Sequence, residues 1–160
     1  MKIPFEIIVN THADTVLRVC RAVLGAYDAD DAWSETFLAA LRAYPALPED
    51  ANVEAWLVTI AHRKALDVVR AQRHYVDDEV PERLALEPTF AEHDELWRAV
   101  RSLSRRQRDA VAYHYVAGLA YADVAAVVGG SNDAARRAAA DGIANLRAAL
   151  RDPLETGGPR

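Results

Sequence analysis

Basic residues at helical spacing are the side chains of this chain with the clearest chemistry. The stretch from Val53 to about His74 carries its apolar residues in one stripe. That stripe leaves a basic edge made of His62, Arg63, Lys64, Arg70 and Arg73. Lys and Arg on one edge of a helix can follow and neutralise the phosphates of a nucleic-acid strand. A solvated helix face is the plainer alternative.

A second stretch has the pattern of a DNA-reading motif. Residues 119–128 predict a short apolar helix, and the two glycines that follow break it, because glycine takes a positive φ without strain. Ser131 is a preferred N-cap for a second helix, in which small and apolar residues recur at three- and four-residue spacing. Helix, tight turn and helix is the plan of a helix-turn-helix, whose second helix enters the major groove. An ordinary helical hairpin in an all-helical core fits these residues equally well.

Catalysis and metal binding find little support in the sequence. The five histidines lack metal-ligand spacing with a matching acid, apart from the weak pair His93 and Asp94. Glycine-rich phosphate loops, serine elbows and HExxH motifs are missing. Cys20 is the single cysteine and lies among valines, which favours a buried structural thiol. We expect no enzyme activity, no cofactor and no metal.

The net charge of −5 argues at first against a nucleic-acid partner, but its distribution removes the objection. Residues 1–76 have a net charge of −2, residues 77–95 of −7 and residues 96–160 of +4. The acidity is therefore concentrated in one short middle segment. The chain also contains no apolar run long enough to span a membrane and no signal peptide, so we expect a cytoplasmic protein.

The periodicity predicts an all-α fold with two small helical domains. The first domain covers residues 1–75, the acidic linker 76–89, the second domain 90–152 and a polar tail 153–160. Helices are expected over 5–24 with a break near Asn10 and Thr11, from residue 28 to about 44, over 53–74, 90–100, 105–117 and 119–128, and after Ser131. Asn52 is expected to cap the third of these helices.

Four stretches resemble motifs of bacterial RNA polymerase sigma factors, in the order and at the spacing of that family. They are DADDAWSETFL (28–38), WLVTIAHRKALDVVR (56–70), LSRRQR (103–108) and GLAYADVA (118–125). The short linker leaves no room for a middle domain, which is typical of the extracytoplasmic-function (ECF) type. The resemblance covers most of residues 5–150.

The resemblance implies a partner for each domain. The first domain of such proteins binds the clamp of core RNA polymerase and opens the downstream promoter element. The last domain holds the upstream element in the major groove and touches the polymerase flap. By position, the polymerase-binding candidates are Asp28, Asp30, Asp31 and Glu35, while Phe37 is expected in the core.

The same resemblance assigns two sets of residues to promoter DNA. The downstream candidates are Asn52, Arg63, Lys64, Arg70 and Arg73, and the loop 46–52 is expected to form the pocket that holds a melted base. The upstream candidates are Ser131, Asn132, Arg136 and Arg137.

The recognition helix departs from the family pattern. Ala138, Asp141 and Ile143 stand where basic residues are usual, and Asp133 and Asp141 would repel phosphate. Gly142 inside the helix costs about 0.5–1 kcal/mol relative to alanine. Because fewer phosphate contacts remain, we expect weak or unusual binding of the upstream element.

The poor recognition helix leaves open a second function, that of a sigma-like interaction module that binds polymerase or a regulator with little DNA binding of its own. The resemblance also implies an anti-sigma regulator that wedges between or clasps the two domains. The acidic linker, through Asp77, Asp78, Glu79 and Glu82, is expected to mask Arg63, Lys64 and Arg70 in the free protein.

Overall fold

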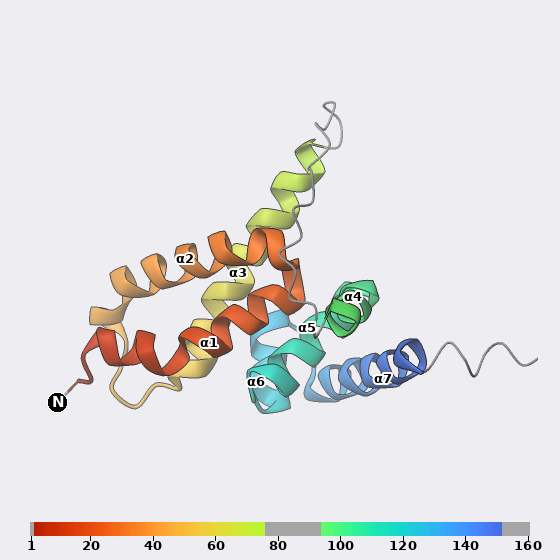
Figure 1. Ribbon diagram of the computed structural model, residues 1–160. Coiled ribbons are helices and arrows are strands. Elements are labelled where there is room, and N and C mark those ends of the chain that lie inside the picture. The colour runs from red at the N-terminus through yellow and green to blue at the C-terminus, as the bar shows by residue number, and fades with distance from the viewer. Residues whose placement is uncertain (1, 76–93, 152–160) are drawn as a thin grey trace, which may run out of the picture.

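The computed structural model describes residues 2–75 and 94–151, and these two ranges are helical with no strand. The first half contains α1 (Phe5–Leu24), α2 (Ala26–Ala43), the 3-10 turn η1 (Tyr44–Ala46) and α3 (Val53–Tyr75). The second half contains α4 (Asp94–Ser102), α5 (Arg105–Val111), the π-helical turn η2 (Ala112–Val116), α6 (Tyr121–Val128) and α7 (Asn132–Leu150). Figure 1 shows their arrangement, which confirms the all-α prediction.

The first half is a unit of three long helices in mutual contact. A single residue, Gly25, joins the antiparallel helices α1 and α2, with a φ of 86° that side chains other than glycine rarely adopt. The indole Nε1 of Trp33 on α2 donates to the carbonyl oxygen of Ala13 on α1 at 3.0 Å. Phe37 and Cys20 are buried, as the sequence predicts.

The predicted break of the first helix near Asn10 and Thr11 is wrong. α1 runs from Phe5 to Leu24 without interruption. The hydroxyl of Thr11 donates to the carbonyl oxygen of Ile7, one turn earlier, at 2.7 Å. That bond satisfies the hydroxyl within the helix, so a polar pair on the solvent side does not end it.

The other predicted helices are found with shifted ends. The predicted helix 105–117 is divided between α5 and η2, and the predicted helix 119–128 begins two residues later, at Tyr121. α4 extends to Ser102, whereas residues 90–93 of its prediction lie outside the described residues. η2 explains the division, because its Ala117 N–H bonds to the Ala112 carbonyl oxygen, five residues back, and widens the turn.

The second half depends on close packing of α5 against α7. The buried face of α7 consists mainly of small residues: Ala135, Ala138, Ala139 and Gly142. A Cβ on Gly142 would lie 2.6 Å from Cγ2 of Val111, far inside van der Waals contact. From the sequence alone, Gly142 only lowers the stability of its helix relative to alanine. The structure shows that the close packing of α5 against α7 requires a glycine at this position.

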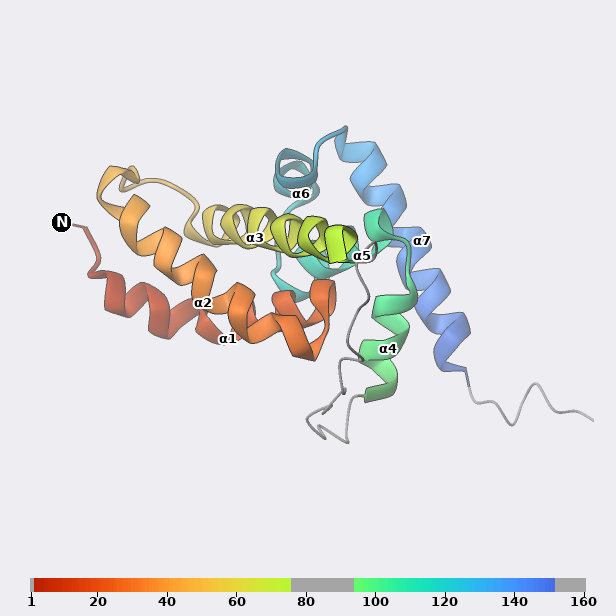
Figure 2. The same cartoon turned by 90° about the horizontal axis from the view of Figure 1, so that it is seen from above.

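The two halves pack against each other, and their buried side chains form one core. α1 contacts α4, α5 and η2, while α3 contacts α6. The view from above shows α6 beside α3 and α4 beside the region where α1 meets α2 (Figure 2). The division of the chain into the domains 1–75 and 90–152 stays a prediction.

Two predicted segments fall outside the described residues. They are the linker 76–89, with the masking residues Asp77, Asp78, Glu79 and Glu82, and the tail 153–160. Within the described ranges, none of the helices has the length and apolar character needed to cross a bilayer.

Candidate polymerase and nucleic-acid interfaces

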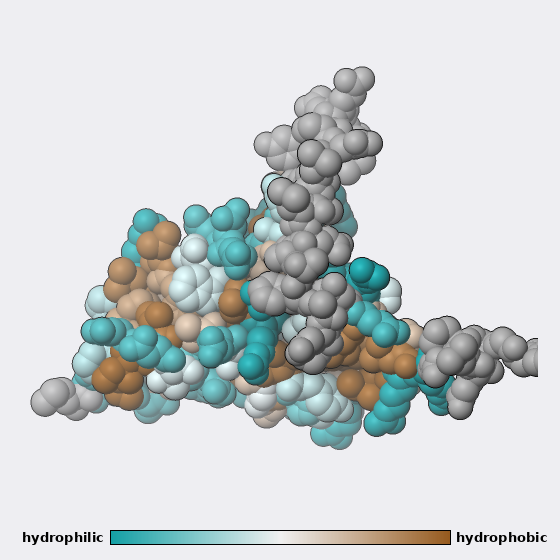
Figure 3. Space-filling view, in the orientation of Figure 1, coloured by the Kyte–Doolittle hydropathy of each residue, from teal (hydrophilic) through white to brown (hydrophobic). Residues whose placement is uncertain are grey.

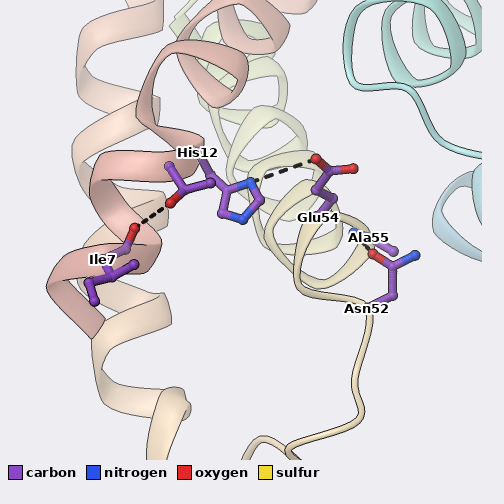
Figure 4. A network of polar contacts seen from close by, with 6 residues as sticks. Ile7, His12, Asn52, Glu54 and Ala55 are labelled. Atoms are coloured by element: carbon purple, nitrogen blue, oxygen red, sulfur yellow. Dashed lines mark hydrogen bonds and ion pairs between the residues drawn. The ribbon is translucent and has the colours of Figure 1, made fainter. Parts of the chain in front are cut away.

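Two polar contacts fix the start of α3 (Figure 4). The side-chain Oδ1 of Asn52 accepts a hydrogen bond from the Ala55 backbone N–H at 3.1 Å, which confirms the predicted N-cap. Glu54 Oε1 lies 3.8 Å from Nδ1 of His12 on α1, an ion pair when the imidazole is protonated. The cap marks where the preceding loop ends and α3 begins, and the second contact joins this first turn of α3 to α1.

The loop before α3 is shaped by two short turns. The Leu47 N–H donates to the Tyr44 carbonyl oxygen at 3.0 Å, and the Ala51 N–H donates to that of Pro48 at 3.1 Å. The Tyr44 ring packs between Phe5 and Trp56, with centroid separations of 5.4 and 6.3 Å. Trp56 is thereby placed against the core, whereas a base pocket in the loop 46–52 stays a prediction.

The basic edge of α3 is open to solvent over most of its length. Arg63, Arg70 and Arg73 are exposed and Lys64 is half-buried. Asp67 is also exposed, and it lies one turn from both Arg63 and Arg70, so negative charge interrupts this edge. The edge can present guanidinium groups to a phosphate backbone, which is the chemistry that the sequence predicts.

His62 does not belong to that edge, in contrast to the sequence-based expectation. Its Nδ1 lies 2.6 Å from the Tyr113 hydroxyl and 3.9 Å from Oδ2 of Asp109, both in the second half of the chain. Tyr113 is fully buried and Asp109 is 5 % exposed. We call His62, Asp109 and Tyr113 the junction cluster.

Burial controls the charges of the junction cluster. It raises the pKa of Asp109 to about 6, although Arg105 and Arg108 act in the opposite direction. It lowers the pKa of His62, and the charge of Arg105 adds to that effect. Oδ1 of Asp109 has no hydrogen-bond partner among the described residues. The packed arrangement of the two halves therefore favours the neutral forms of both groups.

Arg108 links the two halves through backbone carbonyl groups. Its guanidinium donates to the Val23 carbonyl oxygen, in the last turn of α1, at 3.2 Å. It also donates to the carbonyl oxygens of Arg101 at 2.7 Å and of Leu103 at 3.0 Å. Carbonyl groups at helix ends lack partners within the helix, so one arginine completes the ends of both α1 and α4.

The outer face of α2 combines acids with exposed leucines. Asp30, Asp31 and Glu35 are exposed, and Leu38 and Leu41 follow at helical spacing with about half of their surface exposed (49 % and 52 %). Hydrophobic residues gather where α2 ends and α1 begins (Figure 3). This face has the mixed composition of a protein-binding surface.

Asp28 differs from the other acids of α2. It is half-buried, and its Oδ2 accepts a hydrogen bond from Nε2 of Gln72 on α3 at 2.8 Å. It therefore has a structural contact in addition to its predicted role toward polymerase.

The exposed surface of α7 carries few cations. Ser131 Oγ accepts from the Ala134 N–H at 3.0 Å, which confirms the predicted N-cap. The upstream candidates Ser131, Asn132, Arg136 and Arg137 are all exposed. Asp133 and Asp141 are exposed as well, whereas Ala138 is buried and faces the core. The surface that this helix offers to DNA is thus nearly balanced in charge.

The sequence does not predict the junction cluster, nor the stacking of the His114 ring on the Tyr121 ring, whose centroids lie 3.9 Å apart. A weak signal for the first exists, since Asp109 begins a run of otherwise apolar residues and a buried acid needs polar neighbours. For the second, His114 and Tyr121 are too far apart in sequence for their spacing to indicate contact.

Family models match both halves of the chain. The model described as Sigma-70 region 2 matches residues 8–75, and that described as Sigma-70, region 4 matches residues 93–146. The first match covers α1–α3 except for the first three residues of α1, and the second contains nearly all of the second half.

Three curated proteins show similar sequences. RNA polymerase sigma factor CarQ of Myxococcus xanthus is 31% identical over 155 residues, which are 91% of this chain and 88% of that protein. ECF RNA polymerase sigma factor BldN of Streptomyces coelicolor is 33% identical over 75% of this chain and 50% of its own length. ECF RNA polymerase sigma factor SigC of Mycobacterium tuberculosis is 31% identical over 63% of this chain. The chain spans little more than half of that protein, 58%.

Two solved structures share the fold. The sigma factor RpoE in complex with the anti-sigma factor NepR, from Bartonella quintana, superposes with a TM-score of 0.81 at 20% identity, covering 93% of this chain and 98% of that one. CnrH in complex with the cytosolic domain of CnrY gives a TM-score of 0.68 at 22% identity, covering 96% and 89%.

Proposed function

Because the chain belongs to the sigma-70 family of RNA polymerase sigma factors, in its ECF group, we propose that it binds core RNA polymerase and directs it to promoters, where it takes part in melting the DNA. The observation that carries the proposal is the order of the two regions on one fold, region 2 on α1–α3 and region 4 on the second half. The protein acts in the cytoplasm, with no catalytic reaction of its own.

The outer face of α2 is the proposed polymerase-binding surface. Asp30, Asp31 and Glu35 supply negative charge, and the half-exposed Leu38 and Leu41 supply apolar area next to it. Such a combination suits an interface with an apolar centre and a charged rim.

Each of the two promoter elements is assigned to one helix. The basic edge of α3 neutralises the phosphates of the separated strand at the downstream element, with Asn52 at its start. The first turns of α7, with Ser131, Asn132, Arg136 and Arg137, enter the major groove of the upstream element.

The packing of α6 against α3 affects how the two promoter elements can be bound at the same time. It holds the helix-turn-helix against the helix assigned to the other promoter element. The two elements lie apart along the DNA, so polymerase binding has to separate the two halves at the junction cluster. An anti-sigma protein is the proposed regulator, and stabilising the packed arrangement is one way in which it would act. One solved neighbour of this fold, RpoE, is in complex with the anti-sigma factor NepR.

Reconstitution tests the proposed function. Core polymerase with and without the chain is incubated with a promoter library, and the transcripts are sequenced. Transcripts that begin at defined sites only when the chain is present support the proposal. Polymerase binding without initiation would instead support an interaction module, and the absence of both would overturn the proposal.

The polymerase surface has its own test. The triple variant Asp30→Asn, Asp31→Asn, Glu35→Gln and the double variant Leu38→Ser, Leu41→Ser should each weaken binding to core polymerase about tenfold or more. Asp14→Asn removes an exposed acid of α1 and is the matched control. Equal binding by the control and both α2 variants would exclude this face.

A further inference from the structure

Three side chains from separate elements form a stack beside the recognition helix. The rings of His114, on η2, and Tyr121, at the start of α6, lie 3.9 Å apart between centroids and are inclined by only 13°. The guanidinium carbon of Arg136, on α7, lies 5.3 Å from the centroid of the Tyr121 ring. The Tyr121 ring is common to both contacts, and we call the three side chains the His–Tyr–Arg stack.

The stack is anchored at its base. Nδ1 of His114 lies 2.7 Å from the carbonyl oxygen of Leu119, and a carbonyl only accepts, so this nitrogen carries the proton. The ring of Tyr115 meets His114 edge-on, at 4.8 Å and 87°. With one nitrogen bonded and one side packed, the imidazole has little freedom to rotate, and the ring of Tyr121 above it is held in turn.

The third member of the stack, Arg136, is a cation that remains accessible. Arg136 is exposed and is the fifth residue of α7, within the part of a recognition helix that reaches base edges. A guanidinium over an aromatic face is attracted by the ring quadrupole, and this limits the rotamers of a flexible side chain. An arginine oriented before binding loses less conformational freedom when it binds.

Arg137 is the contrasting neighbour. Successive residues of an α-helix point about 100° apart, so Arg137 projects from a different side of α7 than its neighbour over the Tyr121 ring. The two arginines that the sequence presents as equivalent are thus different in the structure. One is oriented for a directional contact, and the other is suited to a phosphate, which accepts a cation from many directions.

We propose that Arg136 is the specificity-determining residue of the upstream element, reading a guanine in the major groove, and that Tyr121 and His114 are positioning residues that orient its guanidinium. A fixed, planar fork of donors matches the O6 and N7 acceptors of guanine, which is the commonest specific arginine contact. This inference rests on the proposed function and assigns most of the sequence selectivity of α7 to one side chain.

The experiment compares base preference rather than affinity alone. Holoenzyme reconstituted with the full chain is bound to duplexes in which each upstream base pair is varied in turn. Arg136→Ala and Tyr121→Leu should both lower the preference for guanine at the same single position, by roughly tenfold. The double variant should lose no more than either single one, because both act on one contact. Tyr121→Phe keeps the ring and should keep the preference.

Two controls make the outcome decisive. Arg137→Ala should weaken binding evenly across all duplexes and leave the base preference unchanged. Thermal unfolding of Tyr121→Leu and Tyr121→Phe shows whether the packing of α6 is intact. An unchanged guanine preference in Tyr121→Leu would overturn the positioning role, and an unchanged preference in Arg136→Ala would overturn the assignment of Arg136. Wild-type chain that gives no promoter-specific binding at all would instead contradict the proposed function.

Discussion

α3 and α7 are the two helices assigned to promoter DNA, and they obtain their positions in different ways. α3 buries full-sized side chains such as Leu57 and Ile60 against α1 and α2, and its exposed edge carries three arginines and a half-buried lysine. α7 buries alanines and a glycine against α5, and its exposed surface carries as many acids as arginines near its start and middle. The first can act through charge, whereas the second depends on how a single arginine is oriented.

A helix with few cations can still be specific for a DNA sequence. Phosphate contacts contribute affinity without sequence information, and base contacts contribute specificity. A helix with many mobile cations serves the first purpose, and a helix with one oriented arginine serves the second. Four sets of variants test this contrast between α3 and α7.

The largest effect is expected from removing charge on each helix. Arg63→Gln with Arg70→Gln should lower promoter affinity of the holoenzyme by about a hundredfold, and Arg136→Gln with Arg137→Gln by about tenfold. The salt dependence should also fall more for the α3 pair, by roughly 0.7 in slope for each phosphate of a single strand that is no longer neutralised. Binding is measured at several salt concentrations. Asp67→Asn, on the same edge of α3, is the control and should raise affinity. A larger decrease in the α7 pair would reverse the contrast.

The next largest effect is on the stability of the packing of α3 against the second half, which depends on pH. The packed state raises the pKa of Asp109 from 3.8 to about 6, so this group contributes stability below pH 4 that is lost as the pH rises through 6. The packed state lowers the pKa of His62 below 6.5, so that group contributes stability above pH 6.5 that is lost on acidification. The two contributions oppose each other in the wild-type chain.

Single variants of the junction cluster should separate these contributions. Relative to wild type, His62→Gln should gain stability on acidification from pH 7 to 4, because the variant lacks the imidazole whose lowered pKa opposes protonation of the folded state. Asp109→Asn should lose stability over the same range, on the order of 2 kcal/mol. Urea unfolding at several pH values gives the unfolding free energy of each variant relative to wild type, and its slope against pH. Cys20 stays neutral over this range because burial raises its pKa to about 12. Slopes of the same sign in the two variants would contradict the opposite pKa shifts of His62 and Asp109 in the packed state.

A smaller effect tests the packing of α7. Gly142→Ala should destabilise the chain by about 1–2 kcal/mol, because the clash with Val111 outweighs the gain in helix propensity. Adding Val111→Ala supplies space for the new methyl group, so the double variant should be destabilised by less than the sum of the two single variants. Thermal or urea unfolding measures all three. Additive destabilisation would show that the two residues do not share the constraint.

The smallest effect compares the caps of the two helices. Asn52→Ala and Ser131→Ala should each cost about 1 kcal/mol in unfolding free energy, since each removes one side-chain acceptor from a helix start. Asn52→Asp and Ser131→Thr keep an acceptor and should recover most of that free energy. Weakened promoter binding in Asn52→Asp, with stability retained, would show that the amide also contacts DNA.

Local chemistry explains which parts of the fold the sequence predicts. Asn52 and Ser131 cap helices as expected, and Gly25 and Gly129 end them, because each acts within a few residues of its own position. The break expected near Thr11 fails, since its hydroxyl bonds within the helix instead of competing with it.

Contacts between distant residues explain what the sequence does not predict. Nothing local to Gly142 indicates that Val111 lies against it, and nothing local to His62 indicates Tyr113. The candidate sites divide in the same way. Helical spacing predicts the exposure of the α2 acids Asp30, Asp31 and Glu35 and of the α3 arginines. It does not predict that Arg136 and Arg137 have different surroundings, because the ring beside Arg136 belongs to another helix.

Because of the π-helical turn η2, the number of residues in this segment determines how the residues before and after it are oriented relative to each other. Tyr113 and His114 are consecutive, yet one faces the junction cluster and the other supports the recognition helix. Deleting a single residue between Ala112 and Ala117 would restore α-helical geometry and rotate the preceding and following residues by about 100° relative to each other. Substitutions in this turn can be neutral, but a change of one residue in its length would disturb the packing of the halves and the orientation of Arg136 together. Insertions and deletions should therefore be rarer at η2 than amino-acid replacements among proteins that keep both contacts.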